Sequence, residues 1–179
     1  MKQVDITNVQ EAGEGKRLPA GGYICEITKV EDVPEKEYLK IEFDVADGDF
    51  KGYFKDLNEA AGFWAGRYIR SYKPKALPFF KRLCSAVSKS NGNFVFDGGQ
   101  INSNEQTLVG KIVGLVLNDE EYIGNDGNVK TRLYVVGEHS VSDIREGKYK
   151  VPSLKKLPDD DVPFKPAQVE EVDSSDCPF

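Results

Sequence analysis

Aromatic and basic side chains interleave between residues 62 and 75, a segment that contains no acidic residue. This mixture suits single-stranded nucleic acid, because cations neutralise phosphates while aromatic rings stack on bases, each stack contributing about 1–3 kcal/mol. The rings and cations of the segment are Trp64, Arg67, Tyr68, Arg70, Tyr72, Lys73 and Lys75. In the competing interpretation the rings are core residues, because Trp64, Tyr68 and Tyr72 recur at a spacing of four that suits a buried helix face. Composition alone supports the two interpretations equally.

A second candidate set lies on the last predicted strand, residues 129–136. Side chains alternate across a strand, so Lys130, Arg132 and Tyr134 share the face opposite the apolar one. Cations around a ring would extend a nucleic-acid surface. Taken alone, however, the set is better explained by an ordinary solvated face.

The net charge of −6 is distributed unevenly along the 179 residues. Residues 158–179 contain seven acidic residues against Lys165 alone, so this tail carries the whole net charge and residues 1–157 are neutral. An acidic chain normally argues against a nucleic-acid partner, but here the acid is confined to one end, and residues 60–96 contain none. The composition of the tail predicts that it is disordered and long enough to reach a basic groove on the domain.

Enzymatic chemistry finds little support in the sequence. One histidine, three widely spaced cysteines and no Cys-x-x-Cys pair argue against a zinc site and against a disulfide scaffold. The chain has no phosphate-binding loop and no nucleophile elbow, and His139 beside Glu138 fits a surface residue better than a general base. We therefore expect no catalytic residue, no metal and no cofactor. No apolar run approaches the roughly 20 residues of a membrane span, and the first residues do not form a secretory signal.

Hydrophobic periodicity predicts a mainly β domain over residues 1–157, followed by the acidic tail. Strict alternation indicates a strand over 39–45, and apolar residues at helical spacing indicate a helix over 77–90. The other predicted strands are 23–30, 50–57, 108–118 and 129–136, with a hairpin turn at 124–128. Three strands, a helix and two strands follow the order of the OB-fold, a five-stranded Greek-key barrel with one helix between strands 3 and 4.

Several segments resemble a family of single-stranded-DNA-binding proteins encoded by bacteriophages of Gram-positive bacteria. The segments that carry the resemblance are 18–23, 33–39, 62–80, 121–127 and 130–134. The end of the chain is similar to the acidic tip of bacterial single-stranded-DNA-binding proteins, with Cys177 where an aliphatic residue usually stands. An internal copy at 159–164 is closer to that pattern but lacks the free carboxylate. The residues of the two copies that would contact partners are Asp159, Asp160, Asp161, Phe164, Asp173, Asp176, Pro178 and Phe179.

The resemblance implies an OB-fold without catalysis that coats single strands during phage replication and recombination, in the host bacterial cytoplasm. Together with the composition it predicts sequence-independent binding, in which Trp64, Tyr68, Tyr72 and Tyr134 stack on bases. The predicted phosphate contacts are Arg67, Arg70, Lys73, Lys75, Lys130 and Arg132. The tail would compete with DNA for the groove and recruit replication or recombination proteins. The alternative is an OB-fold adaptor that binds a protein partner and no DNA, and the sequence leaves open whether the chain forms a homodimer.

Overall fold

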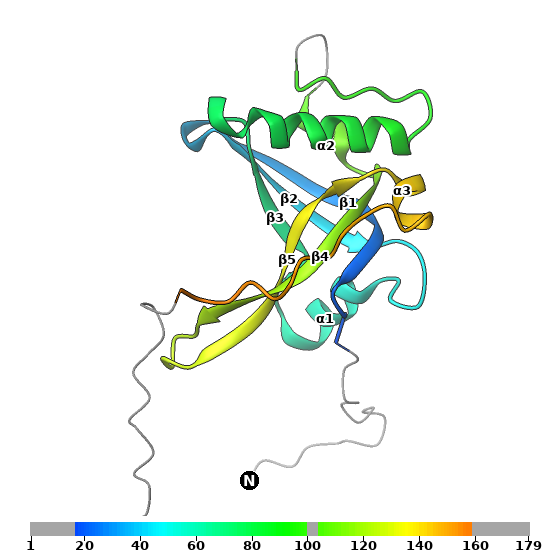
Figure 1. The fold of residues 1–179 in the computed structure, drawn as a ribbon. Coiled ribbons are helices and arrows are strands. Elements are labelled where there is room, and N and C mark those ends of the chain that lie inside the picture. Colours follow the sequence, from blue (N-terminus) through cyan, green and yellow to red (C-terminus); the bar gives the residue numbers. More distant parts are fainter. Residues whose placement is uncertain (1–16, 100–103, 159–179) are drawn as a thin grey trace, which may run out of the picture.

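The computed structural model describes residues 17–99 and 104–158, so the predictions for the acidic tail lie outside the described residues, apart from Pro158. The fold is mainly β: five antiparallel strands form one open sheet in the order β3-β2-β1-β4-β5 (Figure 1). The strands are β1 (Gly21–Val33), β2 (Tyr38–Val45), β3 (Arg67–Ser71), β4 (Ile112–Ile123) and β5 (Val129–His139). The α-helices are α1 (Tyr53–Ala61), α2 (Leu77–Ser90) and α3 (Val141–Arg145), and short 3-10 turns are η1 (Pro34–Lys36), η2 (Pro74–Ala76) and η3 (Glu105–Leu108).

The alternation in β2 predicts its burial correctly. Leu39, Ile41, Phe43 and Val45 are all buried, while the residues between them are half-buried on the other face. Their apolar face joins residues of β1 and β4 in one core, because a strand turns alternate side chains to the same side. The predicted helix is also confirmed: α2 spans Leu77–Ser90 and buries Leu83 against this core.

The predicted third strand, 50–57, is wrong. The segment forms a turn followed by α1, and the third strand is β3 instead. Phe50, Tyr53, Phe54 and Leu57 are spaced as on one face of a helix, and all four pack against the core. The Asp44 carboxylate supports the start of α1, since it accepts hydrogen bonds from the Phe54 and Lys55 amides at 2.9 and 3.3 Å.

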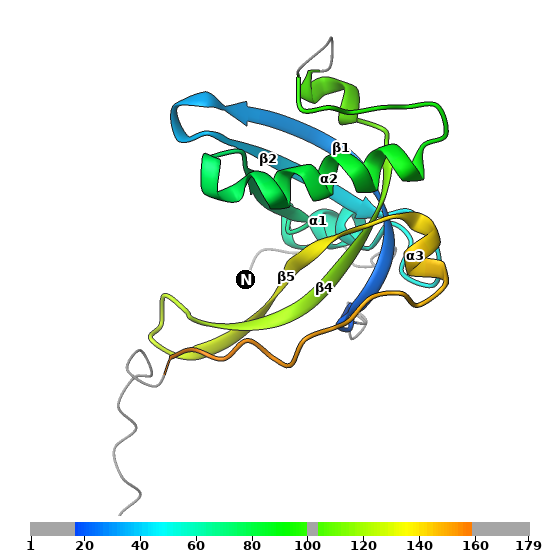
Figure 2. The same cartoon turned by 45° about the horizontal axis from the view of Figure 1, so that its top comes forward.

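β4 and β5 form a hairpin that extends beyond the rest of the sheet (Figures 1 and 2). We call residues 118–134 of this hairpin the arm; its turn lies at 124–128, as predicted. β1 pairs with β4 only up to Leu117, so the edge of β4 beyond that point is open to another segment. Residues 152–157, here called the strap, occupy it: the Lys155 amide donates to the Asp119 carbonyl at 3.1 Å and the Glu121 amide donates to the Lys155 carbonyl at 2.9 Å.

The two edge strands, β3 and β5, are not paired with each other, so the sheet remains open in the described part of the chain. α2 follows β3 after the 3-10 turn η2 and lies across one end of the sheet (Figure 1). Its side chains contact β5 and Tyr72, the residue that follows β3, so α2 lies against both edges of the sheet. None of the helices within residues 17–99 and 104–158 is both long enough and apolar enough to span a membrane.

Candidate nucleic-acid interface

The register of β3 decides which of its predicted residues reach solvent. Tyr68 lies opposite Ile41, and Arg70 lies opposite Leu39. Because Ile41 and Leu39 point into the core, Tyr68 and Arg70 point inward as well. Arg67 lies on the outer face and is exposed. The sequence prediction treated all three as one surface, but the strand separates them.

Tyr68 is a packing residue. Its ring meets the ring of Phe43 edge to face, with 5.9 Å between centroids, and its hydroxyl is buried with no hydrogen-bond partner in the described part of the chain. Burial, and next the charge of Glu138, raise the pKa of Tyr68 well above its ordinary value. Arg70 lies over the ring, with its guanidinium carbon 5.4 Å from the centroid, so the ring packs within the protein and does not present an open face to a base.

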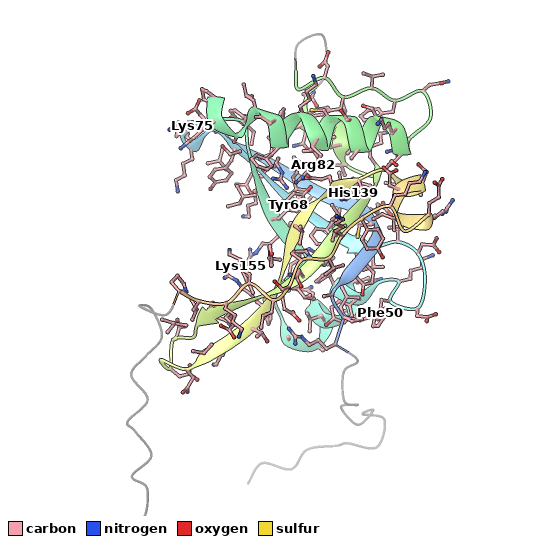
Figure 3. The ribbon with its side chains drawn as sticks, viewed as in Figure 1. Phe50, Tyr68, Lys75, Arg82, His139 and Lys155 are labelled. Atoms are coloured by element: carbon pink, nitrogen blue, oxygen red, sulfur yellow. The ribbon has the colours of Figure 1, made fainter. Side chains whose placement is uncertain are left out.

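Arg70 belongs to a buried ion cluster that connects β3, β5 and α2. Glu138 on β5 has no exposed side-chain surface, and its neighbour His139, expected at the surface, is half-buried. The Nε and Nη2 atoms of Arg70 each lie 2.7 Å from Glu138 Oε1, and Arg82 Nε of α2 lies 3.4 Å from Oε2. Figure 3 shows Arg82 and Tyr68 between these elements. A buried carboxylate with these partners fixes the position of the two unpaired edge strands.

Trp64 and Tyr72 are half-buried against the core on either side of β3. The Trp64 indole donates its N–H to the Gly66 carbonyl at 2.9 Å, and the Tyr72 hydroxyl donates to Asp32 at 2.8 Å. Desolvation and this bond to Asp32 raise the pKa of Tyr72 to about 12. The three rings do pack against the core, but not on a helix: Tyr68 lies on β3, Trp64 precedes the strand and Tyr72 follows it.

Three predicted cations of this segment remain available to a ligand. Arg67, Lys73 and Lys75 are exposed and form no ion pair within the described residues. They extend from β3 to the turn before α2. Figure 3 labels Lys75 at the start of α2, on the same side of the view as the arm.

The arm brings the second predicted set together on one face, which we call the arm ladder. Lys130 lies opposite Tyr122, Arg132 opposite Glu120, and Tyr134 opposite Asn118. The guanidinium carbon of Arg132 lies 5.1 Å from the centroid of the Tyr122 ring. The arrangement alternates rings with cations, as contacts with stacked bases and phosphates require.

The strap adds a cation to the arm ladder that sequence reasoning missed. Lys155 Nζ lies 5.4 Å from the centroid of the Tyr134 ring and 2.9 Å from a carboxylate oxygen of Glu120 (Figure 3). Tyr122 was missed too, although hairpin register counted back from the 124–128 turn would have placed it opposite Lys130. No sequence signal placed Lys155, since its strand partner lies 35 residues earlier in the chain.

Carboxylates hold the cations of the arm ladder in place. Glu120 accepts from Arg132 at 2.8 Å, and Asp126 pairs with Lys130 at 2.9 Å. Partial burial opposes ionisation of Glu120, but hydrogen bonds from Lys155 and Arg132 outweigh it and hold the pKa of Glu120 below its ordinary value. The bond from Lys130 lowers the pKa of Asp126 to about 2. Because Arg132 and Lys155 remain more than half exposed, a phosphate can approach them from solvent.

Comparison with known proteins gives no relative for the chain: no family model matches it, and no curated protein matches it. The described residues also contain no group of three or more histidine, cysteine, aspartate or glutamate side chains arranged to hold a metal ion.

Proposed function

We propose that this chain is a sequence-independent single-stranded-DNA-binding protein of a bacteriophage, which coats single strands during replication and recombination in the host bacterial cytoplasm. The observation that carries the proposal is the arm ladder, in which Tyr122 and Tyr134 alternate with exposed cations on one face. Rings and cations in this arrangement can bind bases and phosphates of any sequence, because every base has a face that can stack on a ring.

The proposal includes an OB-fold. The sheet order β3-β2-β1-β4-β5 and a helix between the third and fourth strands are those of that fold, which can be a partly open barrel. In OB-folds, oligonucleotides lie across strands 2 and 3 and contact the loop between strands 4 and 5. Here that loop is the tip of the arm, and the exposed Arg67 lies on strand 3. In the proposed OB-fold the two cationic regions would correspond to the positions that such folds use for binding.

The structure changes the roles that we assign to the predicted residues. Tyr68 and Arg70 pack inside, and Trp64 and Tyr72 pack against the core, so base stacking passes to Tyr122 and Tyr134. The proposed phosphate contacts are Arg67, Lys73, Lys75, Lys130, Arg132 and Lys155. The acidic tail keeps its proposed role in recruiting partners and competing with DNA, and in the sequence it directly follows the strap.

Binding is tested with a fluorescently labelled oligo-dT and a duplex of the same length. We expect the single strand to bind more tightly, with log affinity falling against log salt with a slope of about −3.5 if about five phosphates are neutralised. Replacing Lys130 and Arg132 together by Gln should weaken binding, whereas the matched double variant Lys51→Gln and Lys55→Gln, on exposed residues near α1, should not. Absence of single-strand binding, or equal loss in both double variants, would reject the proposal.

A groove along α2 favours a second candidate, an adaptor that binds a protein and no DNA. The groove has a volume of about 1330 Å³ between α2 and the segment that follows it. Its apolar lining includes Leu39, Tyr72, Leu77, Phe80 and Phe96. The same oligonucleotide titration decides between the candidates, since an adaptor leaves the anisotropy of the labelled oligo-dT unchanged.

A further inference from the structure

Phe79 and Arg82 form an exposed pair on a side of α2 that the groove does not use. They are three residues apart and therefore neighbours on the helix surface. The guanidinium carbon of Arg82 lies 5.5 Å from the centroid of the Phe79 ring. Half of Phe79 is exposed, as is 40% of the Arg82 side chain, and neither residue lines the groove. An exposed ring beside a cation is a combination that can stack on a base and pair with a phosphate.

Arg82 is held more loosely than the other arginine of the ion cluster. Its two hydrogen bonds, to Glu138 Oε2 and to the Val136 carbonyl, measure 3.4 and 3.3 Å, while both contacts of Arg70 with Glu138 measure 2.7 Å. Arg70 alone neutralises the buried carboxylate, so the cluster as a whole carries one positive charge. Arg82 can therefore turn to another anion without leaving Glu138 unpaired.

Gly137 makes the space that Arg82 occupies. A Cβ atom at this position would lie 2.5 Å from Arg82 Nη2 and 2.7 Å from its Cζ, closer than real contacts allow. The backbone of Gly137 is not in the left-handed region, so its conformation does not require glycine. Glycine here leaves room for the guanidinium next to the backbone of β5, where Arg82 donates to the Val136 carbonyl.

We propose that Phe79 and Arg82 form a subsite for one nucleotide of the single strand, with the ring of Phe79 stacking on the base and Arg82 donating to the phosphate. The proposal rests on the proposed function and extends its surface from β3 to α2. The chemistry favours a nucleotide because an aromatic face and an incompletely neutralised cation lie side by side. Arg82 shares the Glu138 carboxylate with Arg70 of β3, so the subsite adjoins the inner side of that strand, while Arg67 lies on its outer face.

Three variants test the subsite by separate routes. Phe79→Ala removes the ring and should weaken oligo-dT binding by about 5- to 140-fold with an unchanged salt slope, as loss of one stack requires. Arg82→Gln should reduce the magnitude of the salt slope by about 0.7, the share of one phosphate. Gly137→Ala should weaken binding less than Arg82→Gln, because its methyl group displaces the flexible end of Arg82 but leaves the positive charge in place.

Lys81→Gln is the matched control, because Lys81 lies on the same helix but lines the groove. It should leave affinity and salt slope as in the unaltered protein. The melting temperature of Phe79→Ala should equal that of the unaltered protein, since the ring is half exposed and lies outside the core.

The outcomes separate the subsite from the function on which it rests. If Phe79→Ala and Arg82→Gln bind like the unaltered protein while the Lys130 and Arg132 double variant does not, the subsite is wrong and the function stands. If the unaltered protein binds no single strand, both fail. If Phe79→Ala changes the sedimentation of the protein but not its affinity for DNA, Phe79 serves contact between two copies and the subsite is again wrong.

Discussion

Two regions of the molecule place one glutamate between two cations, and they differ in burial. On β5, the fully buried Glu138 pairs with Arg70 and Arg82. These two partners come from a strand and a helix that are distant in sequence. On the arm, Glu120 pairs with Arg132 and Lys155, whose side chains are 60% and 63% exposed. Burial makes the first cluster a support of the fold, because a charge that loses its partner there cannot be rehydrated. Exposure leaves the second cluster free to exchange its carboxylate for a ligand phosphate.

The largest effect should follow removal of the buried carboxylate. Glu138→Ala leaves Arg70, which is 13% exposed, without its partner, and we expect the free energy of unfolding to fall by about 3–5 kcal/mol. Urea denaturation followed by Trp64 fluorescence measures the change. A loss below about 1 kcal/mol would mean that the interior cluster behaves like a surface pair.

Aromatic residues of the two regions should also differ in their effect on binding. Tyr134→Ala on the arm should weaken oligo-dT binding by about 1–3 kcal/mol, because one base loses its stacking partner. Tyr68→Phe is the interior counterpart: it keeps the buried ring, removes a hydroxyl without a partner in the described chain, and should leave affinity unchanged. Titration of both variants with the labelled oligonucleotide tests this contrast. If only Tyr68→Phe weakened binding, Tyr68 and not Tyr134 would be the residue that contacts the base.

Salt dependence should distinguish the arginines of the two regions. Arg132→Gln removes an exposed cation and should reduce the magnitude of the log–log salt slope by about 0.7. Arg70→Gln should destabilise the fold and leave the slope as it is, because its guanidinium is bonded to Glu138. Affinity measured across a salt series gives both slopes. Equal slope changes in the two variants would indicate that Arg70 reaches the phosphates.

The smallest effect is expected at Glu120, whose own side chain is largely covered but whose two cationic partners are exposed. Glu120→Gln should change the free energy of unfolding by no more than about 1 kcal/mol, because its partners are solvated. The folded-state pKa of Glu120 is lowered, so its contribution to stability is present above the ordinary value of 4.5 and is lost as the pH falls through the folded pKa. An NMR titration should place this carboxyl below 4.5, and a midpoint at or above 4.5 would contradict the hydrogen bonding described for the arm.

Prediction from sequence succeeded where a local pattern has one physical meaning. The alternation of β2, the helical spacing of α2 and the turn residues at 124–128 each depend on one short segment alone. All three predictions are confirmed. The segment 50–57 was mistaken for a strand because the turn at 46–49 was taken to lead into one, although Phe50, Tyr53, Phe54 and Leu57 have helical spacing. The rings of 64–72 were ambiguous because a spacing of four keeps residues on one face in either element.

The sequence by itself determined that residues 60–96 carry cations without acids, that seven acidic residues lie beyond residue 157, and that Lys130, Arg132 and Tyr134 share a strand face. Only the tertiary structure decided which of these side chains meet water. The outward position of Arg67 and the inward position of Arg70 depend on the register with β2, and the pairing of Glu138 with Arg70 joins residues 68 positions apart. The physical reason is that burial and ion pairing are set by elements that meet across the fold, and their separation along the chain leaves no periodic trace in the sequence.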